Sequence, residues 1–282
     1  CSSRTAVVDR IFHEHHVGHC TSCGMTYALV ESTVAELEIH YGNYPVRKVL
    51  SPVTALRYDE LLERFEQYRN GSKILDVGCG AGMFLERAAS KGWDVHGTEY
   101  GASSVTASLS RGIPVIEGPL DPRNYKTASF DVICSFEVIE HLTHPSQELD
   151  VMISLLRPGG LLYITTPNFN CLDRRISKGK WSVVNYPEHL NYFTPSTLNS
   201  LIQDKGMRNL WLKTTGMSIS RLMAGRTEDA SVKANARKTE EDLRNDMETK
   251  LHMKIAKKMS NWILNFFKLG DSMKAAYVKP ES

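Results

Sequence analysis

Residues 74–82 read Ile-Leu-Asp-Val-Gly-Cys-Gly-Ala-Gly, and this stretch decides the fold class. A glycine-rich turn here joins an apolar strand at 73–77 to a helix at 83–91. Glycine allows the tight turn and lets a ligand approach the backbone, while the N-terminus of the following helix favours a carboxylate or phosphate. Asp76 lies inside the strand, where a carboxylate needs a polar ligand to be tolerated. The stretch therefore predicts a nucleotide-type binding loop.

Strands and helices alternate along the chain around this loop. We expect helices at 53–69, 83–91, 103–111, 145–156 and 195–205, and strands at 73–77, 95–99, 114–117, 130–135, 161–166, 209–215 and 271–279. The run Arg157-Pro158-Gly159-Gly160 is expected to end the helix at 145–156. This alternation is typical of an α/β fold with a doubly wound parallel sheet.

An acidic residue ends the second expected strand. Glu99 follows the loop by about twenty residues, and a carboxylate in that place can pair with both hydroxyls of a ribose. The third glycine of the loop comes one residue early, so that Met83 stands where a dinucleotide fingerprint has glycine. The pattern predicts an adenosine-containing ligand. A dinucleotide-dependent oxidoreductase is the alternative that Met83 disfavours.

Four motifs in this order resemble class I S-adenosylmethionine-dependent methyltransferases. They are D-V-G-C-G-A-G-M-F-L from Asp76, then Glu99, then F-D-V-I-C-S-F-E-V-I-E-H-L at 130–142, then L-L-R-P-G-G-L-L-Y-I-T-T-P-N at 155–168. The resemblance runs from about 73 to 215 and resumes at about 270–280. It implies a Rossmann-like, mostly parallel seven-stranded sheet with an antiparallel last strand. It also implies S-adenosylmethionine as cofactor.

The resemblance implies a set of cofactor-binding residues at the ends of the strands: Asp76, Gly78, Gly80, Gly82, Glu99, Tyr100, Leu120, Phe136 and Glu137. The glycine loop would line the methionine end of the cofactor, Glu99 would bind the ribose and Tyr100 would flank the adenine. Leu120 and Asp121 occupy the loop that meets the adenine in this family. Phe136 and Glu137 would close over the cofactor.

The segment 181–193 is dense in Tyr, Glu, His and Trp. Ligands of open α/β folds bind beyond the carboxyl ends of the strands, so this cluster predicts a pocket for the methyl acceptor. The run P-E-H-L-N-Y-F-T-P resembles methyltransferases that modify sugars and small metabolites. Tyr186, Glu188 and His189 match a Tyr-x-Glu-His motif of sugar C-methyltransferases, by which His189 would be the general base. Alternatively, His189 packs the loop or caps the helix after Thr194.

A second cluster follows the fourth strand and contains Glu137, Glu140, His141 and His144. Glu137 and His141 would share a face if this segment were helical. A similar E-x-x-E-H stretch can hold a divalent cation in ubiquinone-type O-methyltransferases, and carboxylate with imidazole suits such ions. Alternatively, His141 only orders the loop beside the cofactor.

The N-terminal segment is rich in cysteine. Cys20 and Cys23 form a C-x-x-C pair followed by glycine, which is typical of a zinc knuckle, and Cys1 is a third sulfur upstream. The segment resembles the zinc-ribbon head that precedes many such methyltransferases. Because the chain begins at Cys1, we expect a fragment of a longer product that has lost one cysteine ligand. Alternatively, the fourth ligand is one of four nearby histidines, His13, His15, His16 or His19, or the knuckle holds no metal.

Residues 226–268 contain no Pro or Gly and are predicted to be helical. Apolar residues at steps of three and four from Leu251 to Phe267 form an amphipathic stripe, which we expect to pack on the domain core. The alternative is a lid or a dimer surface. The mixed charge of this insertion predicts no membrane-surface helix, because such a helix shows a basic polar face.

The charge balance limits the partners. The 282 residues include 34 Lys and Arg and 32 Asp and Glu, a formal charge of +2, which argues against nucleic acid as the main partner. Ser135-Phe136-Glu137-Val138 also departs from the N/D-P-P-Y-type motif of base methylation. No apolar run approaches the roughly 18 residues of a membrane span. Of the six cysteines, those beyond the first 23 residues are isolated, which predicts a reducing, cytoplasmic location.

The predicted organisation is a zinc-ribbon-like segment at 1–40, a methyltransferase domain at 41–216, a helical insertion at 217–269 and the last strand at 270–282. The predicted function is methyl transfer from S-adenosylmethionine to a hydroxyl or carbon of a sugar or glycosylated metabolite, by a chain that forms a homodimer. The alternatives are a quinone- or phenol-type O-methyltransferase and a non-catalytic cofactor-binding or zinc-mediated interaction protein.

Overall fold

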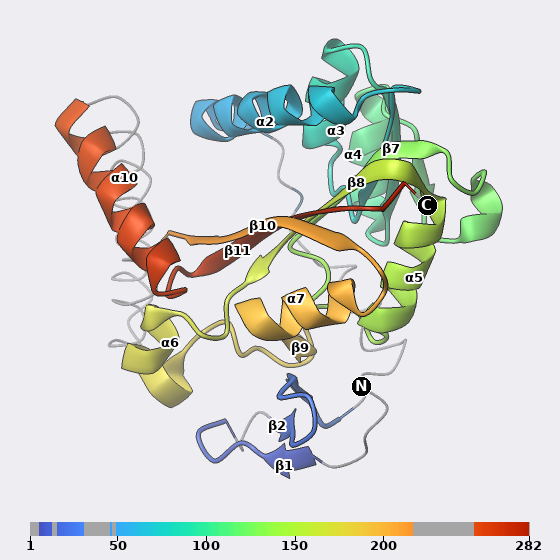
Figure 1. The fold of residues 1–282 in the computed structure, drawn as a ribbon. Helices are drawn as coiled ribbons and strands as arrows, with labels where there is room; N and C mark the ends of the chain where they lie inside the picture. Colours follow the sequence, from blue (N-terminus) through green and yellow to red (C-terminus); the bar gives the residue numbers. More distant parts are fainter. Residues whose placement is uncertain (1–5, 13–15, 31–45, 47–48, 217–250, 282) are drawn as a thin grey trace. The chain divides into compact units, whose positions relative to one another are not determined.

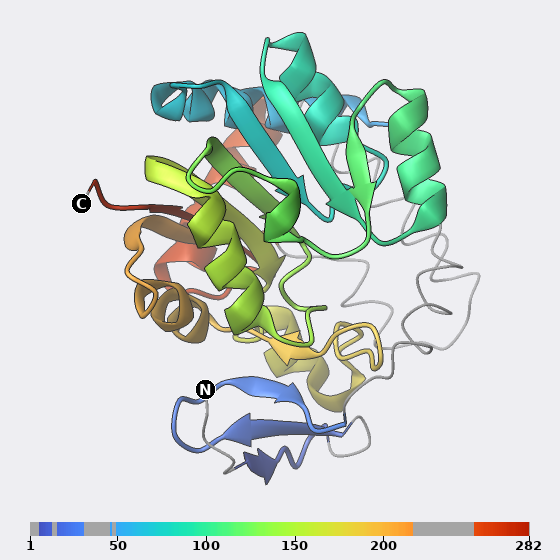
Figure 2. The same ribbon diagram turned by 90° about the vertical axis from the view of Figure 1, so that its right-hand side faces the viewer.

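The strand that leads into the glycine loop, β4 (Lys73–Val77), lies inside a seven-stranded sheet with the order β10-β11-β8-β7-β4-β5-β6. A computed structural model describes residues 6–12, 16–30, 46, 49–216 and 251–281. The strands that pair in parallel with β4 or with each other run side by side in Figure 2: β5 (Asp94–Glu99), β6 (Val115–Glu117), β7 (Phe130–Phe136) and β8 (Leu156–Pro167).

The last strand, β11 (Ser272–Val278), runs antiparallel to its neighbours β8 and β10 (Arg208–Thr215) (Figure 1). Gly159 N donates to Lys279 O at 2.8 Å, and Lys279 N donates to Gly160 O at 3.0 Å, so the start of β8 meets the end of β11. Asp271 N donates to Gly216 O at 2.9 Å, so the start of β11 meets the end of β10. These pairings confirm the predicted mostly parallel sheet with an antiparallel last strand.

The helix expected at 145–156 ends at Leu155, before the run from Arg157 to Gly160, as the sequence predicts. The run itself belongs to β8, which therefore begins earlier than the strand expected at 161–166. Phe130 pairs with Leu156 whereas Val132 pairs with Leu161, and this register shift accommodates the run within the strand. Pairing with β11 satisfies its backbone. The Arg157 side chain anchors it further, since Nε lies 2.5 Å from Asp131 Oδ1 and Nη2 donates to Tyr68 O at 2.6 Å.

The five helices expected around the sheet are confirmed: α2 (Pro52–Phe65), α3 (Met83–Ser90), α4 (Ala102–Ser110), α5 (Pro145–Leu155) and α7 (Pro195–Gln203). Ser51 caps α2, because its hydroxyl accepts a hydrogen bond from Thr54 N at 3.3 Å. The helix then tightens into a 3₁₀ turn at Glu66–Tyr68. The short helix α6 (Leu172–Ser177) has no counterpart among the predicted elements.

The chain divides into two compact units, which are described separately. The glycine-loop unit comprises 32–165, 199–211 and 275–282, and the N-terminal unit comprises 1–31, 166–198 and 212–274. In the glycine-loop unit, apolar side chains of α2 and α3 pack with one face of the strands, and Leu62, Phe65, Phe84 and Ile74 are buried there. The domain boundaries expected from the sequence stay a prediction.

The N-terminal unit contains a small sheet that the sequence did not predict. Its order is β1 (Ala6–Val8), β2 (Val17–Cys20), β3 (Thr26–Ala28) and β9 (Asn191–Tyr192), with antiparallel neighbours. One buried cluster lies beside it: Phe12, Val17, Phe169, Cys171, Trp181, Val183, Val184 and Tyr192. The cysteine-rich start of the chain and the predicted acceptor segment 181–193 thus share a sheet and a core.

The helix α10 (Leu251–Phe266) belongs to the N-terminal unit and is the described part of the predicted insertion, whose residues 217–250 lie outside the described part of the chain. Its polar side contacts the end of β10, because Asn265 Oδ1 accepts from Thr214 N at 3.0 Å and Asn261 Oδ1 accepts from Gly216 N at 2.9 Å. The apolar stripe is exposed at Ile255, Met259, Trp262, Ile263, Phe266 and Phe267. The expectation that the stripe packs on the core is therefore wrong for these residues. Searched over its described residues, the chain shows no helix that is long and apolar enough to cross a membrane.

Candidate cofactor and acceptor sites

The glycine loop between β4 and α3 combines close packing with an opening. Gly78, Gly80 and Gly82 have φ values of 74°, 56° and 72°, in the left-handed region that favours glycine. A Cβ on Gly78 would lie 2.5 Å from a Val138 methyl, and one on Gly82 would lie 2.2 Å from Ser108 Oγ. A Cβ on Gly80 would meet no atom within 4 Å. The outer glycines are therefore required for packing, while the middle one borders open space.

Asp76 is buried at the end of β4, with 2% of its surface exposed, and its Oδ1 has no hydrogen-bond partner among the residues that the structure describes. Burial, and secondarily the negative charge of Glu99, raises the pKa of Asp76 well above its ordinary value. A carboxyl group in this state is costly unless a ligand supplies a donor or a positive charge. The burial of Asp76 therefore agrees with the expectation that its carboxyl group needs a polar ligand.

Glu99 lies at the end of β5, beside the glycine loop. Its Oε2 accepts a hydrogen bond from Gly80 N at 2.9 Å, and its Oε1 accepts one from Gly101 N at 2.8 Å. The parallel register places Thr98 opposite Val77, so both acids reach the same edge of the sheet. Tyr100 follows and is exposed. Asp76, the three glycines, Glu99 and Tyr100 therefore lie within one unit, and their role in binding a cofactor stays a prediction.

The remaining predicted cofactor residues, Leu120, Phe136 and Glu137, differ from one another in burial, contacts and backbone conformation. Leu120 is buried, and the neighbouring Asp121 is paired with the Arg123 guanidinium at 2.6 Å. Phe136 packs against Phe84, with ring centroids 4.9 Å apart, and so faces the core cluster. Glu137 has a φ of 54°, a conformation that is strained for a residue with a Cβ, and its N donates to Thr165 O at 2.9 Å.

Glu148, in the first turn of α5, was missed by the sequence analysis. Its carboxylate accepts a hydrogen bond from the backbone of Leu120, and its charge acts on Tyr100. Burial raises the pKa of Glu148. The Glu148 side chain therefore connects the loops at Tyr100 and Leu120, which the family resemblance assigns to the adenine. In the sequence, the signal for this role is an acidic residue in the first turn of the helix that follows the fourth strand.

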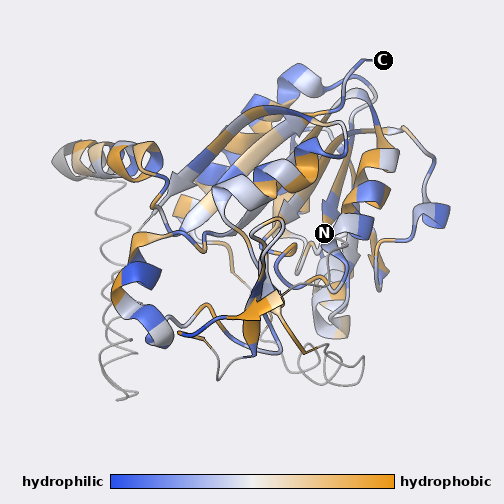
Figure 3. Ribbon diagram, turned by 60° about the horizontal axis from the view of Figure 1, so that its bottom comes forward, coloured by the Kyte–Doolittle hydropathy of each residue, from blue (hydrophilic) through white to orange (hydrophobic). Residues whose placement is uncertain are grey.

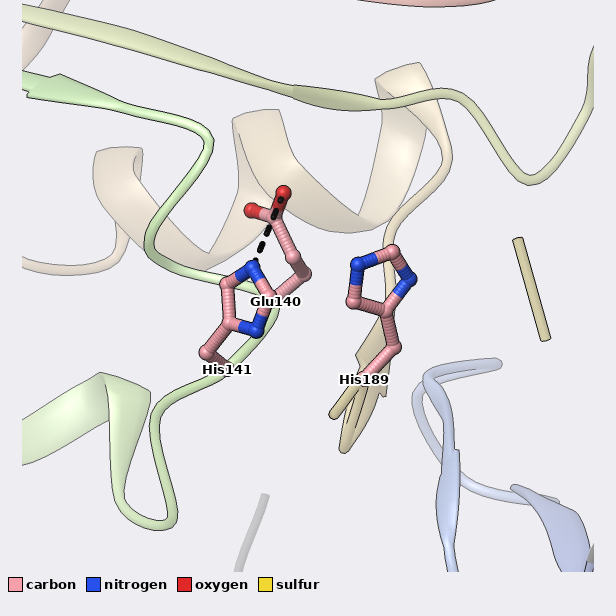
Figure 4. Close-up of side chains that lie close together, drawn as sticks. All are labelled: Glu140, His141 and His189. Carbon is pink, nitrogen blue, oxygen red and sulfur yellow. Dashed lines mark ion pairs between the residues drawn. The ribbon is translucent and has the colours of Figure 1, made fainter. Parts of the chain in front are cut away.

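The Glu-His cluster after β7 is a turn, because His141 N donates to Val138 O at 2.9 Å. The condition under which Glu137 and His141 would share a helical face is therefore not met. Glu140 is buried, and its Oε1 lies 3.8 Å from His141 Nε2 (Figure 4). His144 is exposed just before α5. His189, which Figure 4 also labels, belongs to the N-terminal unit and is described with that unit.

In the N-terminal unit, His189 Nδ1 lies 2.6 Å from the carbonyl oxygen of Val183. A carbonyl can only accept, so Nδ1 carries the proton and the neutral ring has its lone pair on Nε2. The Tyr192 hydroxyl donates to His189 O at 2.8 Å, which holds the backbone of the segment. Glu188 accepts from the Asn185 amide at 2.6 Å, and Tyr186 is half-buried nearby in the chain.

The C-x-x-C turn joins β2 to β3. Cys20 is buried and Cys23 exposed, neither forms a disulfide within the described residues, and Ser22 N donates to Cys20 Sγ at 3.4 Å. Gly24, with a φ of 71°, donates its N–H to Cys20 O at 2.9 Å and closes the turn. Cys1 lies outside the described residues. Among those described, no group of three or more ligand-type side chains contains either cysteine.

Comparison with known proteins identifies the family. A methyltransferase-domain family matches residues 53–242. A ubiquinone biosynthesis O-methyltransferase of Photorhabdus laumondii is 30% identical over 128 residues, which cover 43% of this chain and 53% of that protein. One from Marinobacter nauticus is 26% identical over 216 residues, covering 69% of this chain and 88% of that protein. The chain thus spans about half the length of the first of these relatives.

The fold has solved counterparts. The crystal structure of a SAM-dependent methyltransferase from Archaeoglobus fulgidus matches with a TM-score of 0.54 and 15% identity, over 80% of this chain and 93% of that one. At that identity the match shows the fold. Because the family match covers more than half of the residues and the sheet has the expected order, the chain belongs to the methyltransferase-domain family, within the class I S-adenosylmethionine-dependent methyltransferases.

Proposed function

We propose that this chain transfers a methyl group from S-adenosylmethionine to a small-molecule acceptor. The observation that carries the proposal is the buried Asp76 carboxyl beside a loop that is open at Gly80. Within the described part of the chain, Asp76 Oδ1 has no hydrogen-bond partner. An unsatisfied buried polar group costs about 1–3 kcal/mol, which a ligand with a cation or donors would offset. S-adenosylmethionine carries an ammonium group, a sulfonium and a ribose diol, and these suit Asp76 and Glu99.

The residues proposed to bind the cofactor are those expected from the sequence, with Glu148 added: Asp76, Gly78, Gly80, Gly82, Glu99, Tyr100, Leu120, Phe136, Glu137 and Glu148. When bound, the cofactor supplies an activated methyl group and its leaving group. The chain's own contribution is then to align the acceptor and exclude water from it. A hydroxyl acceptor must also lose a proton, which calls for a general base.

His189 is the proposed base. The Val183 carbonyl holds the proton on Nδ1, so Nε2 is the nitrogen that takes the acceptor proton. Tyr186 and Glu188 are proposed to line the acceptor pocket, and Asn185 orients the Glu188 carboxylate. Buried Trp181, Val183 and Val184 fix the segment that carries all of them.

The acceptor is proposed to be a hydroxyl group, and the comparisons favour the phenol or quinol class. The similar curated proteins named above are ubiquinone biosynthesis O-methyltransferases. A sugar or glycosylated metabolite is the second candidate, supported only by the spacing of Tyr186, Glu188 and His189. A homodimer and the absence of a nucleic-acid partner, like a cytoplasmic location, stay predictions.

We also propose a structural zinc ion at the N-terminal knuckle. The hydrogen bond from Ser22 N to Cys20 Sγ and the left-handed Gly24 suit a turn that presents two thiolates. Cys20, Cys23 and Cys1 would hold the ion with a fourth ligand. Its role would be to stabilise the small sheet that β9 shares with β2 and β3.

Isothermal titration of the chain with S-adenosylmethionine and with its demethylated product tests the cofactor. Binding of both is expected, with loss in Asp76→Asn and retention in Asp150→Asn, a surface acid paired with Lys205. Binding of neither ligand would overturn the proposal. Methyl transfer to a catechol, compared with transfer to nucleotide sugars, then decides the acceptor class.

A further inference from the structure

The helix α10 turns an apolar face to solvent. Trp262 is 68% exposed and Phe266 is 67% exposed, and their rings stack with centroids 5.8 Å apart. At about 100° per residue, the other exposed apolar residues fall on the same side: Ile255, Met259, Ile263 and Phe267. Hydrophobic colour recurs along this helix in Figure 3. The patch is larger than the scattered single apolar residues of an ordinary surface.

The opposite side of α10 is anchored within the N-terminal unit. Asn261 and Asn265 accept hydrogen bonds from the backbone at the end of β10, and the Thr214 hydroxyl donates to Leu264 O at 3.0 Å. Lys268 Nζ, just after the helix, donates to Leu212 O at 3.3 Å. Turning the apolar face inward would break these bonds. Its exposure is therefore a consequence of how the helix is held.

The charge of this helix has one sign. Residues 251–268 contain Lys254, Lys257, Lys258 and Lys268 and no Asp or Glu. The mixed charge that argues against a membrane-surface helix comes from the rest of the insertion. A helix with an aromatic and aliphatic face and a lysine-bearing remainder is typical of helices that lie in the plane of an anionic membrane.

We propose that α10 binds the surface of an anionic membrane through this face. The rings of Trp262 and Phe266 enter the boundary between headgroups and acyl chains, while the exposed Lys258 interacts with lipid phosphates. A second copy of the chain would fit this face less well, because residues 251–268 of each copy carry lysines and no acid. The proposal revises the expectation that no membrane is a partner and does not depend on the methyltransferase activity.

Flotation of the full chain with vesicles tests the proposal. Phosphatidylcholine vesicles that contain phosphatidylglycerol are expected to carry the protein, whereas pure phosphatidylcholine vesicles are not. Tryptophan emission should shift to the blue on binding, since Trp93 and Trp181 are already buried while Trp262 is exposed. Trp262→Phe should keep the flotation and lose most of the shift, which shows that the fold and the face are retained.

Two variants separate the apolar and the electrostatic parts. The double variant Trp262→Ser/Phe266→Ser should lower vesicle affinity about tenfold or more, and Lys258→Glu about fivefold or more on anionic vesicles. Leu109→Ser, at an exposed apolar residue of α4, is the matched control and should change nothing. Flotation with neither vesicle, or equal flotation with both, would overturn the proposal. So would self-association that the double variant abolishes in a protein that binds no vesicles.

Discussion

The carbonyl oxygen of Val183 lies 2.6 Å from Nδ1 of His189, and Val183 itself is buried in the core of the N-terminal unit. The core therefore sets the tautomer of the imidazole. A carbonyl oxygen can only accept a hydrogen bond, so the nitrogen that faces it must carry the proton. A ring held in this way keeps Nε2 as its basic nitrogen, which is the property that a general base requires.

Replacing His189 tests that role. His189→Ala should lower kcat by about 10²–10⁴-fold, the range contributed by general bases, while the Kd for S-adenosylmethionine stays within twofold, about the error of a titration. Single-turnover methyl transfer measures the first quantity and calorimetry the second. His16→Ala, at an exposed histidine of the same unit, is the control. A kcat within a few-fold of the wild type would show that His189 only packs the loop.

The raised pKa of Asp76 makes cofactor binding depend on pH. The carboxyl has an ordinary pKa of 3.8, which burial and then the Glu99 charge raise in the ligand-free protein. A cationic ligand prefers the carboxylate, so its affinity should increase as pH rises through the raised pKa. Calorimetry over a pH series measures this, and Asp150→Asn should follow the wild-type curve. An affinity that does not change with pH would show that the Asp76 carboxylate does not interact with the ligand.

The same group should affect the stability of the ligand-free protein with the opposite sign. A carboxyl whose folded pKa is raised stabilises the fold below its unfolded pKa, and this contribution is lost as pH rises through the folded pKa. Asp76→Asn cannot ionise, so at a pH above the folded pKa of Asp76 the ligand-free variant should be more stable than the wild type by about 1 kcal/mol. Thermal unfolding without ligand checks this, and a lower Tm in the variant would contradict it.

The shared core of the N-terminal unit predicts that its first strands support the acceptor segment. Phe12 is fully buried, with its ring 5.9 Å from that of Phe169. Phe12→Ala should cost about 3–5 kcal/mol in that unit and lower kcat, while cofactor affinity persists. Hydrogen exchange of residues 181–193 and calorimetry measure the two effects. Val7→Ala, on the exposed edge strand, should change stability by less than about 0.5 kcal/mol. Equal behaviour of the two variants would argue against the coupling.

Metal analysis tests the knuckle. Zinc per chain should fall in Cys23→Ser and in Cys1→Ser, because each removes a thiolate ligand. Cys171→Ser, a buried cysteine that caps α6, should keep the zinc content of the wild type. Zinc that survives both ligand substitutions would place the ion elsewhere or on histidines.

Local features of the sequence predict the elements of the glycine-loop unit to within a few residues. Strand β4, the turn at Gly78–Gly82, helix α3 and the acid at Glu99 follow from local rules, since apolar runs, glycine and strand-end acids act on their own neighbours. The antiparallel last strand came from the resemblance to a family. The strand through Arg157 was not predictable, because its turn-like residues extend the strand only through bonds to Lys279, Asp131 and Tyr68.

Other features of the chain depend on contacts between segments that are distant in sequence. Strands of two to four residues carry no readable periodicity, so the pairing of Thr26 with Tyr192 could not be inferred from either segment. The tautomer of His189 depends on a carbonyl six residues away that the loop conformation brings to it. For α10, the stripe identified the apolar face. Hydrogen bonds that the Asn261 and Asn265 side chains accept from the backbone at the end of β10 leave this face in solvent, because they hold the polar side of the helix against the strand.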